Sequence, residues 1–217
     1  MDNLYFTTSG KTGYQVFYKP GMDGGGTWFG QEYADVIKEL YRNRVFSNCL
    51  EWCAGPGYIG FNLLDHGLCK NLSLLEIHTP TAEQAIKSKH SIFNGCANAV
   101  TVYNAGSVAA IDPTTKFDLV VGNPPHFPNA SDDPDVSRIE SDPDWAVHAD
   151  FFKNIKTRLA PDGVILLQEN MIGSTPSVFE PYINANNLRI NSWFKSKNWF
   201  DYPDELCKIY YIEIVHA

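Results

Sequence analysis

The stretch that most constrains the fold is EWCAGPGYIG, residues 51–60, in which an apolar run leads into glycines spaced as G-x-G-x-x-G. Gly55, Gly57 and Gly60 fill the three glycine positions. Glycines placed directly after a strand let the backbone turn tightly and approach a ligand at the start of the next helix. The stretch therefore predicts a strand, a tight turn and a helix that together form a ligand-binding loop.

The remainder of the chain alternates short apolar runs with helical stretches, which is the pattern of an α/β fold with a largely parallel sheet. Past Leu188 the pattern changes to two longer alternating runs without a helix between them, which predicts an antiparallel pair closing one sheet edge. The runs suited to buried strands are 48–52, 72–77, 100–104, 117–122 and 164–168.

Composition narrows the classes of function. A formal net charge of -8 leaves little attraction for a polyanion or an anionic membrane. The five cysteines are odd in number and contain no CxxC pair, so neither a disulfide framework nor a zinc site is expected, and no metal is assigned. The first residues do not resemble a signal peptide, and no long apolar run occurs. We therefore expect a soluble cytoplasmic protein.

Two cofactors fit the glycine spacing: a dinucleotide that carries hydride and S-adenosylmethionine, which donates a methyl group. Both cofactors contain a ribose whose hydroxyls an acid could bind. Glu76, 21 residues after Gly55, is such an acid and therefore does not distinguish the two cofactors. Glu51, at the end of the first strand, favours S-adenosylmethionine. Its carboxylate would repel a pyrophosphate, whereas it could hold the ammonium of a methionine moiety.

The run FDLVVGNPPHF, residues 117–127, is a buried strand that breaks into Asn-Pro-Pro-His at the carboxyl end of the fourth strand. Together with EWCAGPGYIG and LLEIHTPTAEQA, in this order and spacing, it resembles the class I S-adenosylmethionine-dependent methyltransferases. More narrowly it resembles the Asn-Pro-Pro-aromatic branch, whose members methylate glutamine side chains or nucleobase nitrogens. The resemblance covers about residues 27–217 and implies a Rossmann-like fold with a mostly parallel seven-stranded sheet, an antiparallel C-terminal pair and helices on both faces.

The resemblance also assigns roles to residues of this chain. His126 stands where the branch usually has an aromatic residue, and Ser107 stands where it usually has an acid. The implied cofactor-binding residues are Glu51, Cys53, Gly55, Gly57, Glu76, Ile77, Gly106, Ser107 and Asn123. The implied catalytic residues are Asn123, Pro124 and His126, and the implied substrate contacts are Pro125, His126 and Phe127.

An amide or ring amine is a poor nucleophile because its nitrogen lone pair is delocalised, as the amide rotation barrier of ~18 to 20 kcal/mol illustrates. The side-chain oxygen of Asn123 and the carbonyl of Pro124 could accept the two N–H bonds and align the nitrogen with the methyl group. His126 could stack on the acceptor or take the proton lost after transfer. The sequence leaves both roles open.

The methyl acceptor stays open among a small molecule, a protein glutamine and a nucleobase, and a cofactor-binding scaffold without turnover is the alternative of another class. Residues 1–26 are expected to form an N-terminal extension and a Gly-rich loop, ahead of a single methyltransferase domain over 27–217. The acidic segment at about 128–144 predicts a mobile loop without a helix before Asp144, on the substrate side. Its carboxylates disfavour nucleic acid as the acceptor without excluding it. No membrane partner is expected, and a dimer or heterodimer stays open.

Two further features have plainer interpretations. His148 is expected to be an ordinary helix or loop histidine. The aromatic residues near the C-terminus are expected to belong to the core and to cover the sheet edge; they are Trp193, Phe194, Trp199, Phe200 and Tyr202.

Overall fold

The computed structural model describes residues 4–21, 26–42, 44–93, 99–196 and 208–217. The chain divides into two compact units, residues 1–106 and 107–217. In the described part of the chain, no helix is both long and apolar enough to cross a membrane.

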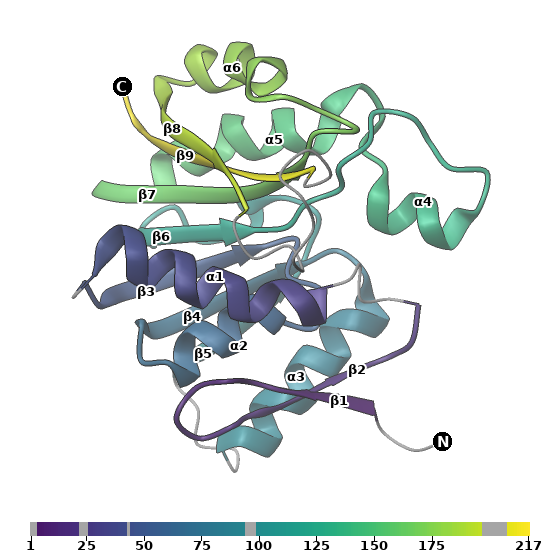
Figure 1. Cartoon of the computed structure of the whole chain (residues 1–217), viewed down its shortest axis with the longest axis vertical. Helices are drawn as coiled ribbons and strands as arrows, with labels where there is room; N and C mark the ends of the chain where they lie inside the picture. The colour runs from purple at the N-terminus through teal and green to yellow at the C-terminus, as the bar shows by residue number, and fades with distance from the viewer. Residues whose placement is uncertain (1–3, 22–25, 43, 94–98, 197–207) are drawn as a thin grey trace. The chain divides into compact units, whose positions relative to one another are not determined.

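The first unit contains three parallel strands and a separate N-terminal hairpin (Figure 1). Strand β4 pairs in parallel with β3 and with β5, so the buried Leu72 lies opposite Cys49 and Val100. The elements are β1 (Leu4–Thr7), β2 (Gln15–Tyr18), α1 (Gly26–Tyr41), β3 (Phe46–Trp52), α2 (Tyr58–Asp65), β4 (Cys69–Glu76), α3 (Thr79–Phe93) and β5 (Val100–Asn104).

In the second unit, β7 pairs in parallel with β6 and antiparallel with β9, and β9 pairs antiparallel with β8. The middle of β7 is apolar and buried, as expected for a strand with neighbours on both sides. The elements are β6 (Phe117–Gly122), α4 (Pro134–Glu140), α5 (Ala146–Ile155), β7 (Leu159–Asn170), α6 (Pro176–Ala185), β8 (Leu188–Lys195) and β9 (Ile209–His216), with short 3-10 helices η1 (Val108–Ala110), η2 (Pro143–Trp145) and η3 (Lys156–Arg158).

The seven strands have the order β5-β4-β3-β6-β7-β9-β8 in a mostly parallel sheet. The five strands and the antiparallel C-terminal pair that the apolar runs predict are confirmed. The expected burial is wrong for β5, in which Val100 alone is buried because the strand lies at the sheet edge. The strand before the Asn-Pro-Pro-His turn, β6, is the fourth of this sheet, as predicted.

The prediction of no helix before Asp144 is wrong, because α4 occupies residues 134–140 within the acidic segment. Pro134 is the first residue of this helix, where the missing N–H of proline costs nothing. Asp132 and Asp133 precede it, and negative charge at a helix N-terminus is favourable. The prolines and acids that argued against a helix therefore mark where it begins.

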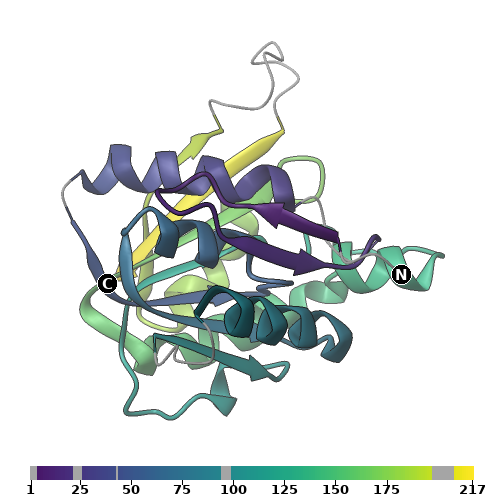
Figure 2. The same cartoon turned by 90° about the horizontal axis from the view of Figure 1, so that it is seen from below.

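Strand β2 of the N-terminal hairpin packs against α3, and the loop of the hairpin is bound to the end of α2 by a buried carboxylate, Asp65 (Figure 2). Oδ2 of Asp65 accepts hydrogen bonds from the Thr8 hydroxyl at 2.6 Å and from the Gly13 N–H at 3.0 Å, and Oδ1 accepts one from the Thr12 N–H at 2.7 Å. Burial opposes ionisation of Asp65, but these hydrogen bonds outweigh it and hold the pKa of Asp65 below its usual value.

We expect Asp65→Asn to lower the free energy of unfolding at pH 7 by about 1.5 to 3 kcal/mol, since it removes the charge that three donors share. The loss should shrink as pH falls through the pKa of folded Asp65, because a depressed pKa stabilises the fold only above that pH. Urea denaturation between pH 7 and pH 3.5 measures both. Asp35→Asn, at a half-exposed ion pair with Lys38, is the control and should change stability by less than about 0.5 kcal/mol. Equal effects of the two variants would contradict the role of Asp65.

Candidate functional site

The loop between β3 and α2 contains the glycine motif in an unusual backbone conformation. Cys53, Gly55 and Gly57 all have positive φ angles, of 52°, 52° and 93°. A Cβ atom at Gly57 would lie 2.8 Å from a methyl of Leu74 and 2.9 Å from the ring of Phe61. Only glycine fits there, because both the left-handed conformation and the close packing exclude a side chain. The half-buried Cys53 accepts the same conformation at a steric cost.

Glu51, the acid next to the end of β3, points its carboxylate at the start of α2. Only 2% of the residue is exposed. Its Oε2 accepts a hydrogen bond from the Gly60 N–H at 2.7 Å, and its Oε1 accepts one from the Ile59 N–H at 3.2 Å. Burial raises the pKa of Glu51 to about 8, against these two hydrogen bonds, and the charge of Glu76 adds to the rise. Glu51 thus fixes the first turn of α2; its contact with a ligand stays a prediction.

Glu76, the last residue of β4, holds the other side of the loop. Its Oε2 accepts a hydrogen bond from the Gly55 N–H at 2.8 Å, and its Oε1 accepts one from the His78 N–H at 2.7 Å. Burial raises the pKa of Glu76, although these hydrogen bonds favour its charged form. Each oxygen keeps a second lone pair that could accept a hydrogen bond from a ligand hydroxyl.

An apolar surface lies beside this carboxyl group. Ile77 is 68% exposed, and its Cδ1 lies 2.8 Å from where a Cβ of Gly106 would be. Ser107, the next residue, accepts a hydrogen bond from the Ala109 N–H at 3.1 Å and so caps η1. A buried acid and an exposed aliphatic side chain in sequence suit the ribose and the flat face of an adenosine.

In the second unit, the Asn-Pro-Pro-His turn directly follows β6. Pro124 is buried, while Pro125, His126 and Phe127 are half-buried. The Oδ1 atom of Asn123 is buried, and no described residue donates a hydrogen bond to it. A buried acceptor without a donor costs about 1 to 3 kcal/mol, so Asn123 is more costly than an apolar residue would be.

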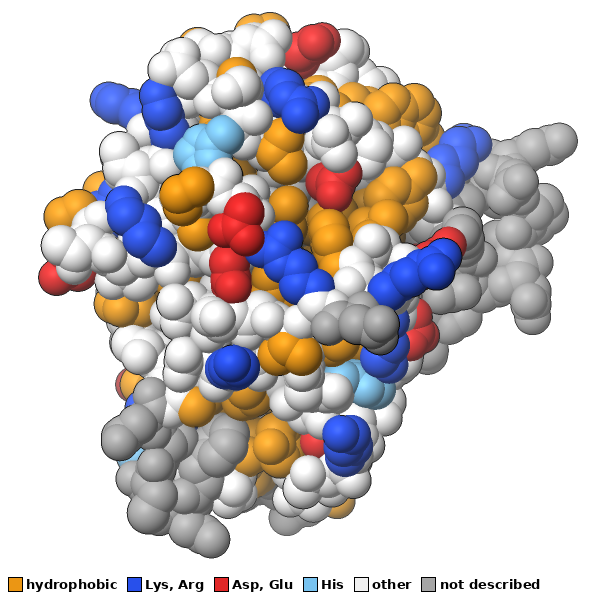
Figure 3. Space-filling model, turned by 90° about the vertical axis from the view of Figure 1, so that its left-hand side faces the viewer, with side chains coloured by type: hydrophobic (Ala, Val, Ile, Leu, Met, Phe, Trp, Pro, Cys, Tyr) orange, Lys and Arg blue, Asp and Glu red, His pale blue; other side chains and the backbone are white. Residues whose placement is uncertain are grey.

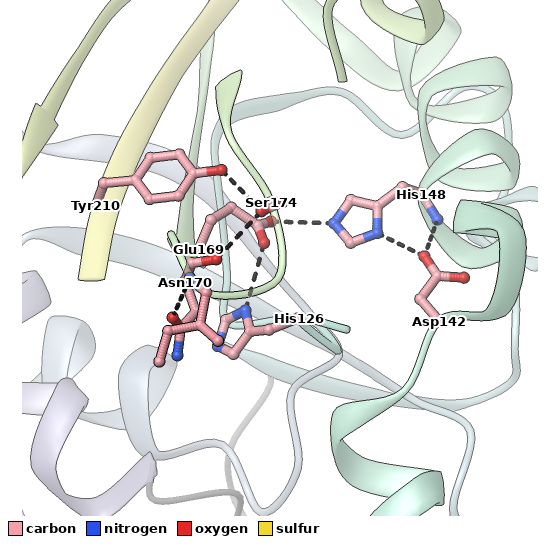
Figure 4. A network of polar contacts seen from close by, with 8 residues as sticks. His126, Asp142, His148, Glu169, Asn170, Ser174 and Tyr210 are labelled. Atoms are coloured by element: carbon pink, nitrogen blue, oxygen red, sulfur yellow. Dashed lines mark hydrogen bonds and ion pairs between the residues drawn. The ribbon is translucent and has the colours of Figure 1, made fainter. Parts of the chain in front are cut away.

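His126 belongs to a buried chain of polar side chains that ends at Asp142 (Figure 4). Nδ1 of His126 lies 3.3 Å from Oε2 of Glu169, and Nε2 of His148 lies 3.0 Å from Oε1 of the same carboxylate. Nδ1 of His148 lies 2.6 Å from Oδ2 of Asp142. Asp142, His148 and Glu169 are fully buried, and we call these three residues with His126 the buried chain.

The charges of the buried chain support one another. Burial opposes the imidazolium of His148, but the carboxylates of Glu169 and Asp142 outweigh it and raise the pKa of His148 to about 9. Burial likewise opposes ionisation of Glu169, yet the charge of His148 and the hydrogen bonds from both histidines hold the pKa of Glu169 below its usual range. His148 and Glu169 therefore each favour the charged form of the other.

The sequence did not predict the buried chain. His148 lies on α5 as a fully buried residue, and Asp142, also fully buried, belongs to the acidic segment for which the sequence predicts a mobile loop. One sequence feature could have marked Glu169 as a site residue: it is an acid near the carboxyl end of an apolar strand, as Glu51 and Glu76 are. Described residues hold no group of three or more His, Cys, Asp or Glu side chains that could bind a metal.

Two of the aromatic residues near the C-terminus, Trp193 and Phe194, lie on the edge strand β8, as expected for residues that cover the sheet edge. Trp193 is 49% exposed on β8. Phe194 is half-buried and stacks on Tyr211, with ring centroids 5.4 Å apart. Trp199, Phe200 and Tyr202 lie outside the described residues.

Comparison with known proteins identifies the fold. No family model and no curated protein sequence matches the chain. Among solved structures, it resembles a putative methyltransferase from Escherichia coli, with a TM-score of 0.64, 14% identity and 99% of each chain covered. It resembles a ribosomal protein methylase from Lactobacillus delbrueckii subsp. bulgaricus, with a TM-score of 0.59, 14% identity, and 90% of this chain and 83% of that chain covered.

A SAM-dependent methyltransferase from Leishmania major gives a TM-score of 0.64 and 19% identity, and covers 90% of this chain and 78% of that chain. At these identities the likeness establishes the fold. The chain thus has the Rossmann-like fold of the class I S-adenosylmethionine-dependent methyltransferases.

The raised pKa of His148 predicts a pH-dependent stability. Because the folded state keeps this proton up to about pH 9, the contribution of His148 is full below about pH 6.5, the usual histidine value, and is lost as pH rises through 9. We expect the unfolding free energy of the wild type to fall between pH 7 and pH 9 by at most about 1.4 kcal/mol per pH unit relative to His148→Gln. Urea denaturation of both proteins measures the difference, and parallel pH profiles would contradict it.

Proposed function

We propose that the chain is a S-adenosylmethionine-dependent methyltransferase that transfers a methyl group to a planar or amino nitrogen of a small molecule or of a protein glutamine side chain. The observation that carries this proposal is the buried Oδ1 of Asn123, which accepts no hydrogen bond from a described residue. A fold retains such an atom at a cost, and an N–H of a bound acceptor would satisfy it.

The first unit has residues that fit the cofactor. The Glu76 carboxyl group would accept hydrogen bonds from ribose hydroxyls, Ile77 and Gly106 would contact the adenine, and the tight turn at Gly55 and Gly57 would admit the methionine end. The cofactor supplies an electrophilic methyl group when it is bound. Glu51 lies beneath this loop and would act chiefly by fixing the first turn of α2.

The second unit has residues that fit the acceptor. Oδ1 of Asn123 would accept one N–H of the acceptor nitrogen, and the carbonyl of Pro124 would accept the other. The fixed φ angle of proline keeps this carbonyl rigid. Two such hydrogen bonds orient the nitrogen and favour a tetrahedral geometry at which its lone pair is available.

The first prediction of this proposal concerns Glu76. We expect Glu76→Gln to weaken the binding of S-adenosylmethionine and S-adenosylhomocysteine by about 1.5 to 3 kcal/mol, the range for hydrogen bonds to a charged group. Isothermal titration calorimetry measures the affinity. Glu83→Gln, which changes an exposed acid on the neighbouring helix α3, is the matched control and should bind as the wild type does. Unchanged affinity in Glu76→Gln would remove Glu76 from the cofactor site.

The second prediction concerns Asn123. We expect Asn123→Ala to abolish methyl transfer while it leaves cofactor affinity within about twofold and does not lower the free energy of unfolding, since it removes a buried acceptor without a described donor. Transfer is measured with radiolabelled S-adenosylmethionine and size-fractionated cell extract. Asn129→Ala, at an exposed residue after the same turn, is the control. Transfer by Asn123→Ala at the wild-type rate would contradict the nitrogen mechanism.

The alternative acceptor, a nucleobase, is favoured by one feature: Arg189, Trp193 and Lys195 are exposed along β8, and basic with aromatic side chains suit nucleic acid. The net charge of -8 opposes it. On the face shown in Figure 3, acidic, neutral and apolar side chains lie among the Lys and Arg side chains. Label recovered in RNA or DNA would establish the nucleobase alternative. Cofactor binding without label in any fraction would instead support a scaffold without turnover.

A further inference from the structure

The buried chain places a second histidine, His148, and two carboxylates behind His126. His148 lies between two carboxylates, and each of its ring nitrogens faces one of them, at 2.6 Å from Asp142 and 3.0 Å from Glu169. Carboxylates accept hydrogen bonds and donate none, so both ring nitrogens of His148 carry protons. His148 is therefore a buried imidazolium.

The state of His148 determines the state of His126. Glu169 uses Oε1 for His148 and presents Oε2 to Nδ1 of His126 at 3.3 Å. Because an ionised carboxylate only accepts, Nδ1 of His126 must be the nitrogen that carries the proton. In neutral His126 the other ring nitrogen, Nε2, then has no hydrogen and offers a lone pair.

Further contacts hold the side chains of the buried chain in this arrangement. Asp142 also accepts hydrogen bonds from the N–H groups of Val147 and His148 in the first turn of α5. The ring of Phe179 stacks on His148 with centroids 4.4 Å apart, which suits an imidazolium. At the other end of the buried chain, the segment after β7 lies directly on the His126 backbone, because a Cβ at Gly173 would clash with the carbonyl oxygen of His126.

The charges of the buried chain do not cancel. Asp142 and Glu169 are negative and His148 is positive, which leaves a net charge of minus one while His126 is neutral. Tyr210, the remaining titratable group near Glu169, is neutral, since burial and the Glu169 charge raise its pKa, and its hydroxyl pairs with Ser174 at 2.8 Å. A proton added to His126 would bring the buried charges to zero.

We propose that Asp142, His148 and Glu169 are positioning residues that hold His126 in the Nδ1-protonated tautomer, so that its Nε2 takes the proton that the acceptor nitrogen loses; this rests on the methyl transfer proposed above. The N–H bond of the methylated nitrogen breaks, its electron pair stays on that nitrogen, and the proton moves to Nε2. His126 becomes an imidazolium that pairs with Glu169, and it returns the proton to solvent afterwards. Its side chain, 15% exposed, has that access.

The tautomer can be measured without a substrate. In wild-type protein labelled with ¹⁵N-histidine, we expect two-dimensional NMR at pH 8 to show His126 with a proton on Nδ1 and a bare Nε2, and His148 with protons on both nitrogens. His126→Gln and His148→Gln assign the signals. A wild-type His126 that carries its proton on Nε2 would overturn the proposal, and the tautomer is read from the wild-type protein, with the two variants serving only to assign its signals.

Glu169→Gln tests the cause. Its neutral amide should shift His126 toward the Nε2-protonated tautomer severalfold and should lower the turnover of labelled methyl from S-adenosylmethionine at least tenfold, with the KM for S-adenosylmethionine unchanged. Glu180→Gln, at an exposed acid on α6, is the control. An unchanged tautomer, or a normal turnover despite a changed tautomer, would overturn the proposal. A wild type that binds no S-adenosylmethionine would overturn the proposed function instead. The NMR result would still decide which ring nitrogens of the buried chain carry protons.

Discussion

A carboxylate near the carboxyl end of a buried strand must find hydrogen-bond donors, and three strands in the described part of the chain have such a group as their last or next-to-last residue. Glu51 on β3, Glu76 on β4 and Glu169 on β7 are all buried. A buried charge without donors would cost several kcal/mol. The segments after β3 and β4 supply N–H donors to Glu51 and Glu76, whereas the turn after β6 and helix α5 supply histidine donors to Glu169. The glycine loop and the Asn-Pro-Pro-His turn, which carry the candidate functions, are among these donor segments.

The kind of donor decides the charge of each carboxyl group. Glu51 and Glu76 receive only backbone N–H groups, which compensate burial incompletely, so their pKa values lie above the ordinary glutamate value. Glu169 receives an imidazolium, whose full charge outweighs burial, so its pKa lies below that value. The first unit thus offers carboxyl groups that a cationic ligand would help to ionise, whereas Glu169 is already ionised and committed to two histidines.

The sequence predicted the features that depend on neighbouring residues. The strands, the glycine turn and the break at Asn123 each follow from a short local pattern. The structure confirms the strands and the tight turn, in which Gly55 and Gly57 have positive φ angles. Helix α4 was missed because proline was read as a helix breaker, although it is compatible with the first helical position. The buried chain was missed because Asp142, His148 and Glu169 meet only after α5 packs beside the end of β7, and no local pattern reports that contact.

Two residues of the second unit adopt strained backbone conformations beside the buried chain. Asp144 and Trp145 are consecutive residues with positive φ angles, of 55° and 56°, and such conformations cost about 1 to 3 kcal/mol each for residues other than glycine. The strained pair lies between Asp142 and α5, and it turns the chain so that Asp142 can cap the first turn of α5 and still reach the His148 ring. The uncompensated acceptor on Asn123 adds a further cost on the same unit. Unfavourable terms persist in a marginally stable fold where the surrounding structure determines them, and these fall on the segments that hold Asn123 and Asp142.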